Sequence, residues 1–355
     1  MKIVTILGVR PQFIKAALVS KEIAKHPELT EIIVHTGQHF DENMSRIFFM
    51  EMGIPTPDYN LGIQSLSHGA MTGRQLEAIE KTLLNEKPDW VLVYGDTNST
   101  LAGALAAAKL NIPLAHVEAG MRSFNRKMPE EINRVLTDHI AEILFASTDT
   151  AEANLIKEGI EISKIHMVGD VMYDAALHFG NIAREKSSII NDLELGKQKY
   201  ILCTVHRQEN TDDSDRLESI VEALNQINIE RRVLMPLHPR TKQIIKKQGI
   251  LLDFEPIEPV GYLDMLVLLM NCNSVITDSG GLQKEAFFFQ KYCVTLRDET
   301  EWVELIDHGF NVLTGANTNR ILETYHKMVN KSSDINIKLY GNGNSRKAIV
   351  DSLFG

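Results

Sequence analysis

Acidic side chains recur in one stretch of this chain, at points where strands end and a helix begins. Asp96 follows the apolar run Trp90–Tyr94, Glu118 follows a second short apolar run, and Glu130 stands in the first turn of a helix. The carboxyl ends of parallel strands meet at one edge of a sheet, where ligands bind. Carboxylates at that edge can take a proton from a substrate and return it. The spacing therefore predicts a shared polar cleft with acid and base chemistry.

Each of these acids also has a plain structural explanation. Asp96 is placed to cap the helix that follows its strand. Glu130 and Glu131 come directly after Pro129, and the helix dipole alone favours acids in a first turn. Arg134 lies four residues after Glu130 and shares its helix face. The recurrence of acids at neighbouring strand ends favours the cleft over these separate explanations.

Cationic side chains follow the first predicted strand. Arg10 and Lys15 stand at the start of a helix, where a phosphate or carboxylate binds well. The alternative is that both are ordinary surface residues. The same turn holds Gly8 but no glycine triplet, so the sequence argues against a nicotinamide cofactor.

Two histidines mark the ends of successive strands in the second half of the chain. His206 stands next to Arg207, and His238 stands two residues before Arg240. Histidine transfers protons near neutral pH, and arginine beside it suits an anion. Either histidine alone would more often be structural, but the pair favours a site.

The sharpest local signal is the turn Ser279, Gly280 and Gly281, which lies between an apolar strand and a helix. Glycines let a ligand approach the backbone, and the first free amides of the helix favour an anion. We interpret this turn as a seat for a diphosphate. Glu285, further along the helix, is placed to accept hydrogen bonds from ribose hydroxyls.

Regular alternation of strands and helices must position these groups. It predicts an α/β fold with doubly wound parallel sheets, arranged as two Rossmann-like domains that face each other across a cleft. The apolar repeat of Ile132, Leu136, Ile140 and Ile143 predicts that the helix after Pro129 buries this stripe. The predicted strands are 2–8, 31–35, 90–94, 113–117, 144–146, 165–168, 200–205, 232–236 and 274–277. The predicted helices are 11–24, one from Glu42, 73–85, 101–110, one from Pro129, 216–227, 242–248, 263–270 and 282–289.

Length and composition restrict the class of protein. A chain of 355 residues is long for one core, and we expect an N-terminal domain of residues 1–169 and a nucleotide-binding domain of residues 170–340. A net charge of −10 argues against nucleic-acid binding. Cys203, Cys272 and Cys293 stand in apolar runs, which is typical of buried thiols in a cytoplasmic protein. The sequence contains no predicted membrane span, signal peptide, metal cluster or Walker loop.

Taken together, these motifs resemble the non-hydrolysing UDP-N-acetylglucosamine 2-epimerase family over nearly the whole chain. The matching motifs are Gly8 to Lys15, Thr36-Gly37-Gln38-His39, Gly95-Asp96-Thr97, His116 to Gly120, Pro129-Glu130-Glu131, Asn133-Arg134, His206-Arg207, Asp278 to Gly281, and Tyr340 to Gly343. The resemblance implies the GT-B-like fold of one class of glycosyltransferases. It also implies that a final helix at 341–355 rejoins the first domain, and that the protein is a homodimer.

The resemblance further implies a reaction and its residues. In the family a base removes the proton at sugar carbon 2 while UDP leaves carbon 1, and UDP then adds back after reprotonation on the opposite face. No redox cofactor is needed. Asp96, Glu118, Glu130 and His206 match the family's catalytic positions. The family's ligand contacts match Arg10, Lys15, Arg134, His206, Ser279, Gly280 and Glu285.

Departures from the common pattern indicate a branch. Gln12 stands where many members have Glu, and Trp302 stands where they have Arg. This combination is similar to the branch that acts on UDP-2,3-diacetamido-2,3-dideoxyglucuronic acid for surface polysaccharides such as the O-antigen of lipopolysaccharide. A neutral Gln12 and an aromatic Trp302 at the sugar end would suit that substrate. Gln38 and Arg74 match part of a regulatory pocket for UDP-N-acetylglucosamine in some bacterial members, but Asp41 departs from it.

Three competing functions use the same motifs. A glycosyltransferase would use the same diphosphate seat but would need an acceptor site. A hydrolysing epimerase would release free sugar, and its opening turn usually differs from that of this chain. A catalytically silent nucleotide-sugar binding module would tolerate the loss of Asp96, Glu118 and Glu130, all of which are present.

Overall fold

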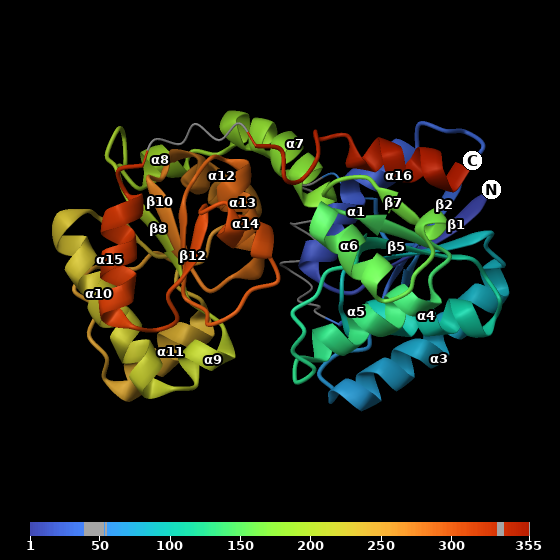
Figure 1. Ribbon diagram of the computed structural model, residues 1–355, viewed down its shortest axis with the longest axis horizontal. Coiled ribbons are helices and arrows are strands. Elements are labelled where there is room, and N and C mark those ends of the chain that lie inside the picture. The colour runs from blue at the N-terminus through green and yellow to red at the C-terminus, as the bar shows by residue number, and fades with distance from the viewer. Residues whose placement is uncertain (39–52, 54, 332–336, 355) are drawn as a thin grey trace. The chain divides into compact units, whose positions relative to one another are not determined.

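The computed structural model describes residues 1–38, 53, 55–331 and 337–354. The chain divides into two compact units: unit 1 comprises Met1–Ala175 and Lys338–Gly355, and unit 2 comprises Ala176–Ile337. Each unit is a parallel sheet flanked by helices (Figure 1). The predicted fold class, α/β with two Rossmann-like domains, is confirmed.

Within its described residues, unit 1 contains a seven-stranded sheet in the order β3-β2-β1-β4-β5-β6-β7. The strands are β1 (Lys2–Leu7), β2 (Thr30–His35), β3 (Tyr59–Asn60), β4 (Trp90–Tyr94), β5 (Leu114–Ala119), β6 (Ile143–Ala146) and β7 (Ile165–Met167). The helices are α1 (Arg10–Ile23), α3 (His68–Glu86), α4 (Asn98–Lys109), α5 (Pro129–Ile140), α6 (Asp149–Lys157), the 3-10 helix η1 (Ile162–Lys164) and α16 (Ser345–Phe354).

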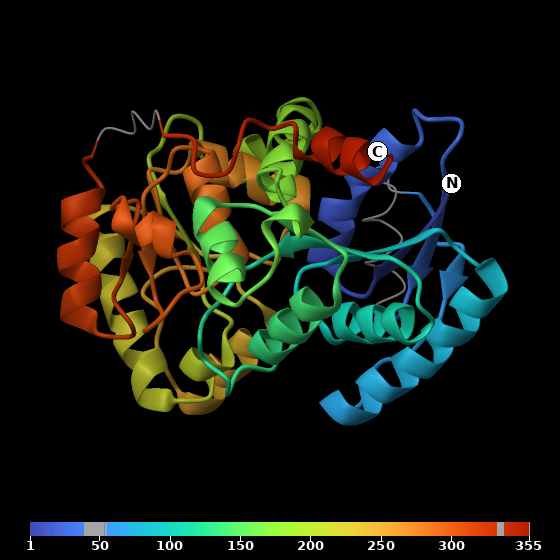
Figure 2. The ribbon, with the colours of Figure 1, turned by 45° about the vertical axis from the view of Figure 1, so that its right-hand side comes forward.

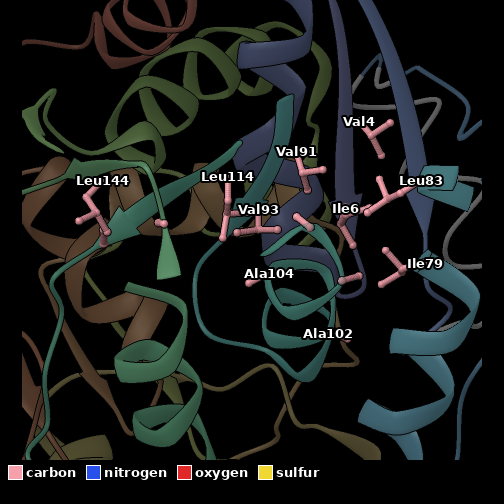
Figure 3. Close-up of a cluster of buried hydrophobic side chains, with 14 of the residues drawn as sticks. Val4, Ile6, Ile79, Leu83, Val91, Val93, Ala102, Ala104, Leu114 and Leu144 are labelled. Atoms are coloured by element: carbon pink, nitrogen blue, oxygen red, sulfur yellow. The ribbon is translucent and has the colours of Figure 1, made fainter. Parts of the chain in front are cut away.

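The core of unit 1 lies where α4 packs on β1 and β4. Both strands are apolar runs with buried side chains, as expected for the centre of a parallel sheet. Gly103 lets the helix approach closely, because a methyl group there would lie 3.1 Å from Ile6 and 3.2 Å from Val93. Figure 3 shows the resulting cluster, in which Ala104 of the helix joins Ile6 and Val93.

The last helix of the chain packs on the first. Helix α16 lies beside α1, as the red and blue helices show in Figure 2. The backbone amides of Ser345 and Arg346 donate to the carboxylate of Asp174 over 3.1 and 3.0 Å, and the Arg346 guanidinium also contacts it. These bonds cap the start of α16 and hold it on unit 1.

Within its described residues, unit 2 contains a five-stranded sheet in the order β12-β11-β10-β8-β9. The strands are β8 (Ile201–Thr204), β9 (Val233–Leu234), β10 (Ser274–Thr277), β11 (Cys293–Thr295) and β12 (Asn311–Leu313). The helices are α7 (Val171–Lys186), which begins in unit 1, α8 (Ile189–Asp192), α9 (Gln208–Thr211), α10 (Ser214–Glu230), α11 (Pro239–Gln248), α12 (Tyr262–Asn271), α13 (Gly280–Phe288), α14 (Val303–Asp307) and α15 (Thr318–Met328). All three cysteines lie in this unit as free, buried thiols, as predicted.

Several elements differ from the predicted ones. The sequence pattern did not indicate α7, β11, β12 or α15, and α3 begins at His68 rather than at residue 73. The helix predicted from Glu42 lies outside the described residues. Among the residues that are described, no helix is both long and apolar enough to cross a membrane.

The orientation predicted for α5 is wrong. Ile132 and Leu136 of the apolar stripe are 42% and 44% exposed. The side chains that α5 buries are polar or charged, namely Glu131, Asn133, Arg134, Thr137 and Asp138. The helix therefore turns its polar face inward, and each buried charge needs partners from other elements.

Candidate active site

Each sheet has one point at which its connections diverge to opposite sides. In unit 1 this switch point lies between β1 and β4, and in unit 2 it lies between β8 and β10. Loops at the carboxyl ends of such strands form the usual ligand crevice of open α/β sheets. The predicted residues Lys15 and Asp96 follow the first pair of strands, and His206 and Ser279 follow the second pair.

Glu118 lies at an irregularity in β5 rather than after it. The pairing of β5 with β6 shifts register between Val117 and Ala119, and the backbone of Glu118 has φ of +73°. A left-handed conformation is costly for a residue with a side chain and is found at functional sites. Here the bulge directs the buried carboxylate to the ammonium group of Lys15, with which it forms an ion pair. Gly95 borders this pair, since a methyl group there would lie 3.3 Å from Glu118 Oε2.

Asp96 pairs with Arg134 across the same edge of the sheet. Arg134 Nε and Nη2 donate to Asp96 Oδ2 over 2.9 and 2.6 Å, and the carboxylate side chain is 28% exposed. The alternative that Asp96 caps α4 is not met, because Thr97 is the N-cap and accepts from the Thr100 amide. Asp96 is thus left partly accessible with one charged partner.

The two acids of the first turn of α5 differ in role. Glu131 is buried and accepts hydrogen bonds from the amides of Ser123 and Phe124, both over 2.9 Å, and from Arg134. Burial alone would raise the pKa of Glu131, but these hydrogen bonds and the Arg134 charge outweigh it and lower that pKa. Glu131 therefore shapes the loop before α5. Glu130 is half-buried beside it and is the acid of the pair open to solvent.

Gln12, which the sequence places at the sugar end, is buried within unit 1. Its side chain is 2% exposed, and its Oε1 accepts from the amides of Gly8 and Val9 over 2.7 and 3.2 Å. Its Nε2 donates to the carbonyl of Tyr94 over 2.6 Å and to Thr100 over 2.9 Å. Gln12 therefore ties the loop after β1 to the end of β4 from within.

Other predicted residues of unit 1 surround this edge. Arg10 is the exposed first residue of α1, and Gln38 Oε1 accepts from the Ser99 hydroxyl over 2.8 Å. Arg74 is exposed on α3. His39 and Asp41 lie outside the described residues, so the predicted regulatory pocket stays a prediction.

In unit 2, Asp278 organises the turn that carries His206 and Arg207. Its buried carboxylate accepts from the amides of His206 and Arg207, each over 3.0 Å, and lies 3.4 Å from His206 Nδ1. Burial lowers the pKa of His206, and the charges of Arg207 and His238 lower it further, while Asp278 acts in the opposite direction. A pKa below the ordinary value keeps the imidazole neutral and able to accept a proton.

The Ser279 turn begins α13 as predicted. Ser279 is the N-cap, and its hydroxyl accepts from the Leu282 amide over 3.4 Å. Gly280 faces charged groups: a methyl group there would lie 3.2 Å from Glu301 Oε1 and 3.6 Å from Arg207 Nη2. Gly281 has open space where its side chain would be. The turn at the start of α13 therefore lies close to the guanidinium of Arg207, with the carboxylate of Glu301 beside it.

Two other predicted residues of unit 2 have structural partners. Glu285 is buried on α13 and accepts from the Tyr262 hydroxyl over 2.9 Å. His238 is the N-cap of α11, and its Nδ1 accepts from the Arg240 amide over 3.3 Å. For His238 the capping bond gives the structural explanation that the sequence left open.

Trp302, the aromatic residue that the sequence places at the sugar end, is also buried. The indole is 5% exposed, and its Nε1 donates to the carbonyl of Gly280 over 3.0 Å. The ammonium group of Lys284 lies 3.9 Å from the centre of its ring, a cation–π contact. Trp302 thus supports the Ser279 turn from behind.

The sequence reasoning missed a buried charge network around Asp138. Asp138 contacts His116 over 2.6 Å and Arg122 over 2.7 Å, and Arg122 reaches both carboxylate oxygens of Glu158. We call these four residues the His116 network. An acid in the middle of an apparently amphipathic helix was its only signal. Asp278 was quoted with its motif but was not assigned a role.

Two Rossmann-like units, with carboxylates at one switch point and an anion seat at the other, define a GT-B-like enzyme class that handles nucleotide-linked substrates. The chain belongs to the UDP-N-acetylglucosamine 2-epimerase family, whose model matches residues 21–354. Members of this family are isomerases, so the predictions of family and enzyme class are confirmed.

Relatives and solved structures agree over the full chain. The UDP-2,3-diacetamido-2,3-dideoxy-D-glucuronate 2-epimerase of Pseudomonas aeruginosa is 55% identical over 356 residues, covering 99% of both chains. A UDP-N-acetylglucosamine 2-epimerase of Methanococcus maripaludis is 47% identical over 100% of this chain and 98% of its own. The crystal structure of Methanocaldococcus jannaschii UDP-GlcNAc 2-epimerase in complex with UDP-GlcNAc and UDP has a TM-score of 0.91 at 45% identity and covers 100% of both chains.

Proposed function

We propose that this chain is a non-hydrolysing 2-epimerase of a UDP-linked, N-acetylated sugar. A base takes the proton from sugar carbon 2, and the electron pair of that bond forms a double bond to carbon 1. The bond from carbon 1 to the diphosphate oxygen breaks, and its electron pair leaves with UDP. Reprotonation of carbon 2 on the opposite face and re-addition of UDP to carbon 1 complete the inversion without a redox cofactor.

The arrangement of Asp96 and Glu118 carries this proposal. Both carboxylates lie at the unit 1 switch point, and each has a cationic partner, Arg134 and Lys15 respectively. A carboxylate beside a fixed cation is ionised near neutral pH and can act as a base. We assign acid and base roles to Asp96, Glu118 and the half-buried Glu130, and contacts with the ligand to Lys15, Arg134, Arg10 and Gln38.

We assign UDP to unit 2, residues 176–337. The Ser279 turn and Arg207 supply amides and a guanidinium for the diphosphate, and Glu285 accepts from the ribose hydroxyls. His206 lies beside this seat with a lowered pKa caused mainly by burial, which suits transfer of a proton to or from the departing UDP. We also assign His238 to the ligand contacts of unit 2, as an outer contact.

The substrate that we propose is the UDP-linked 2,3-diacetamido-2,3-dideoxyglucuronate. The support is the relative of that activity, which is 55% identical, against 47% for a relative that acts on UDP-N-acetylglucosamine. Gln12 and Trp302 are both buried and do not support this choice of substrate. We also propose that the product serves synthesis of a surface polysaccharide such as an O-antigen, and that the enzyme works in the cytoplasm.

We further propose that the protein is a homodimer. Ile132 and Leu136 of α5 form an exposed apolar stripe, 42% and 44% exposed, which a second copy would remove from water. Sedimentation velocity should give twice the mass of one chain. Sedimentation as a single chain at micromolar concentration would contradict this part of the proposal.

Proton NMR in deuterated water tests the reaction. The purified protein is incubated separately with UDP-N-acetylglucosamine and with the diacetamido uronate analogue, and without any acceptor. We expect deuterium at carbon 2 and a new manno isomer with the diacetamido substrate. A response only to UDP-N-acetylglucosamine would reassign the substrate and keep the reaction.

The competing functions would give different products in this NMR experiment. Free sugar without a UDP-linked product would indicate a hydrolysing epimerase. Binding without exchange at carbon 2 for either donor would overturn the epimerase and favour a glycosyltransferase or a silent binding module.

A further inference from the structure

His116 lies in β5, buried between two acceptors. Its Nε2 is 2.7 Å from the carbonyl oxygen of Gly95, and its Nδ1 is 2.6 Å from Oδ1 of Asp138. The side chain is 1% exposed, so water does not complete these contacts. The three residues belong to three different segments: the turn after β4, strand β5 and helix α5.

These contacts fix the protonation of the ring. A carbonyl oxygen can only accept, so Nε2 carries a hydrogen. Asp138 Oδ2 accepts from the Gly120 amide over 3.1 Å and from Arg122 over 2.7 Å, which are the contacts of an ionised carboxylate. An ionised carboxylate is likewise only an acceptor, so Nδ1 also carries a hydrogen. Hydrogen bonds to both acceptors therefore require a hydrogen on each ring nitrogen of His116.

The charges of the His116 network balance. His116 and Arg122 are cationic, whereas Asp138 and Glu158 are anionic. Burial would raise the pKa of Asp138, but the charges of His116 and Arg122 and their hydrogen bonds outweigh it and lower that pKa. Buried ion pairs hold a specific arrangement when every partner is satisfied.

The His116 network joins the segments that carry Asp96, Glu118 and Glu130, the three carboxylates to which we assign acid and base roles. Gly95, whose φ is +62°, directly precedes Asp96. His116 stands two residues before Glu118, and Asp138 lies two turns along α5 from Glu130. A change at His116 would therefore reach all three carboxylates without contact with any of them.

We propose that His116 is a positioning residue of the epimerase: as an imidazolium it locks the Gly95 turn to α5 through Asp138 and so sets the separation of Asp96 from Glu118 and Glu130. This inference rests on the proposed function for its kinetic part. Its structural part, the doubly protonated ring and the lock on the turn, stands on the geometry alone.

Two variants of His116 each remove one of its two hydrogen bonds. In His116→Gln the amide nitrogen takes the place of Nε2 and can still donate to the Gly95 carbonyl. In His116→Asn the shorter amide takes the place of Nδ1, keeps the bond to Asp138 and loses Gly95. We expect His116→Asn to lower kcat by about 100-fold, the size of effect that small misplacements of reacting groups produce.

The other kinetic results follow from the same lock. KM should change little in either variant, because unit 2 holds UDP, and His116→Gln should also lower kcat, because it loses Asp138 and so releases the turn from α5. His326→Gln is the matched control, since His326 lies on α15 outside the His116 network and its side chain is 51% exposed. No loss of kcat in either His116 variant, or a rise in KM that accounts for the loss, would overturn the proposal.

NMR of the protein with 15N-labelled histidine makes the structural part independent of turnover. Both ring nitrogens of His116 should have protonated chemical shifts at pH 7.5, and the Gly95 and Asp96 amides should shift more in His116→Asn than in His116→Gln. An unprotonated nitrogen in the wild-type ring, or amides that do not move, would overturn the lock even in an active enzyme. A wild-type protein that epimerises neither donor would instead overturn the proposed function, and these NMR shifts would still decide the lock.

Discussion

Side chains neutralise the carboxylates at the switch point of unit 1, whereas backbone amides hold the carboxylate at the switch point of unit 2. Glu118 pairs with Lys15, and Asp96 pairs with Arg134. Asp278 of unit 2 instead accepts from the amides of His206 and Arg207. The first arrangement places each acid beside a cationic side chain. The second uses an acid to orient a turn, and the Arg207 guanidinium of that turn faces Gly280.

This difference teaches how one architecture separates two tasks. A group that moves protons must change its charge during the reaction, so its partners must tolerate both states. A group that holds an anion must keep its geometry and its charge. We expect changes to the carboxylates of unit 1 to act mainly on kcat and changes to the anion seat of unit 2 mainly on affinity, whereas a change at His206 should act on kcat.

The largest expected effect is that of Glu118→Gln. The amide keeps the size of the side chain but cannot take a proton, so deuterium exchange at carbon 2 should fall by about 10²- to 10⁴-fold. The affinity for UDP, measured by calorimetry, should change far less. The matched control is Glu142→Gln, because Glu142 is 59% exposed in its pair with Lys164. Exchange at the wild-type rate in Glu118→Gln would remove Glu118 from the chemistry.

Acid pH should have an effect of intermediate size, which is a loss of stability in unit 1. His35, at the end of β2, is 1% exposed and packs edge-on against Phe13. Burial lowers the pKa of His35 from 6.5 to about 4. The folded state thus resists protonation of His35. The contribution of neutral His35 to the free energy of unfolding is complete above pH 6.5 and is lost as the pH falls toward 4. The loss should reach about 2 kcal/mol at pH 5.

Hydrogen exchange at pH 7 and pH 5, corrected for intrinsic rates, measures this loss in each unit. Amides of β2 should lose protection, while those of β8 should change less. The thiols of Cys272 and Cys293 in unit 2 have their pKa raised by burial to about 12 and stay neutral throughout. His206 also has a pKa lowered by burial, but its side chain is 43% exposed and solvent weakens its effect. Equal losses in β2 and β8 would contradict this difference between the units.

The smallest effect is expected from Gly280→Ala in the anion seat. The new methyl group would lie 3.2 Å from Glu301 Oε1, closer than an ordinary contact, and 3.6 Å from Arg207 Nη2. We expect about tenfold weaker UDP binding, or about 1.4 kcal/mol, with the exchange rate at saturating substrate nearly unchanged. Gly73→Ala on α3 is the control, since no described atom lies within 4 Å of its methyl group. A fall in the saturated rate with unchanged affinity would reverse the roles assigned to the two units.

The central strands could be predicted because burial on both faces leaves an uninterrupted apolar run. Trp90–Tyr94 and Ser274–Thr277 have the predicted bounds. The strands Cys293–Thr295 and Asn311–Leu313 contain three residues each, too few for a period to be visible. Their place in the sheet comes from hydrogen bonds to neighbours that the local sequence does not reveal.

The site was predictable as a set of residue types but not as a set of contacts. Glu118 and Asp96 could be found because they stand at strand ends. The inward polar face of α5 could not, because the periodicity of Ile132 and Leu136 indicates the opposite orientation. Burial of Asp138 is favourable only through partners distant in sequence, such as His116, and those contacts exist only in the fold.

The left-handed backbone of Glu118 sets stability against activity at one position. A residue with a side chain costs about 1–2 kcal/mol more than glycine in this conformation. Glycine there would relax the strand and remove the carboxylate in the same step. Glycine there would also leave the largely buried ammonium group of Lys15 without its ion-pair partner, so a laboratory search for stable variants should keep Glu118 and Lys15 together.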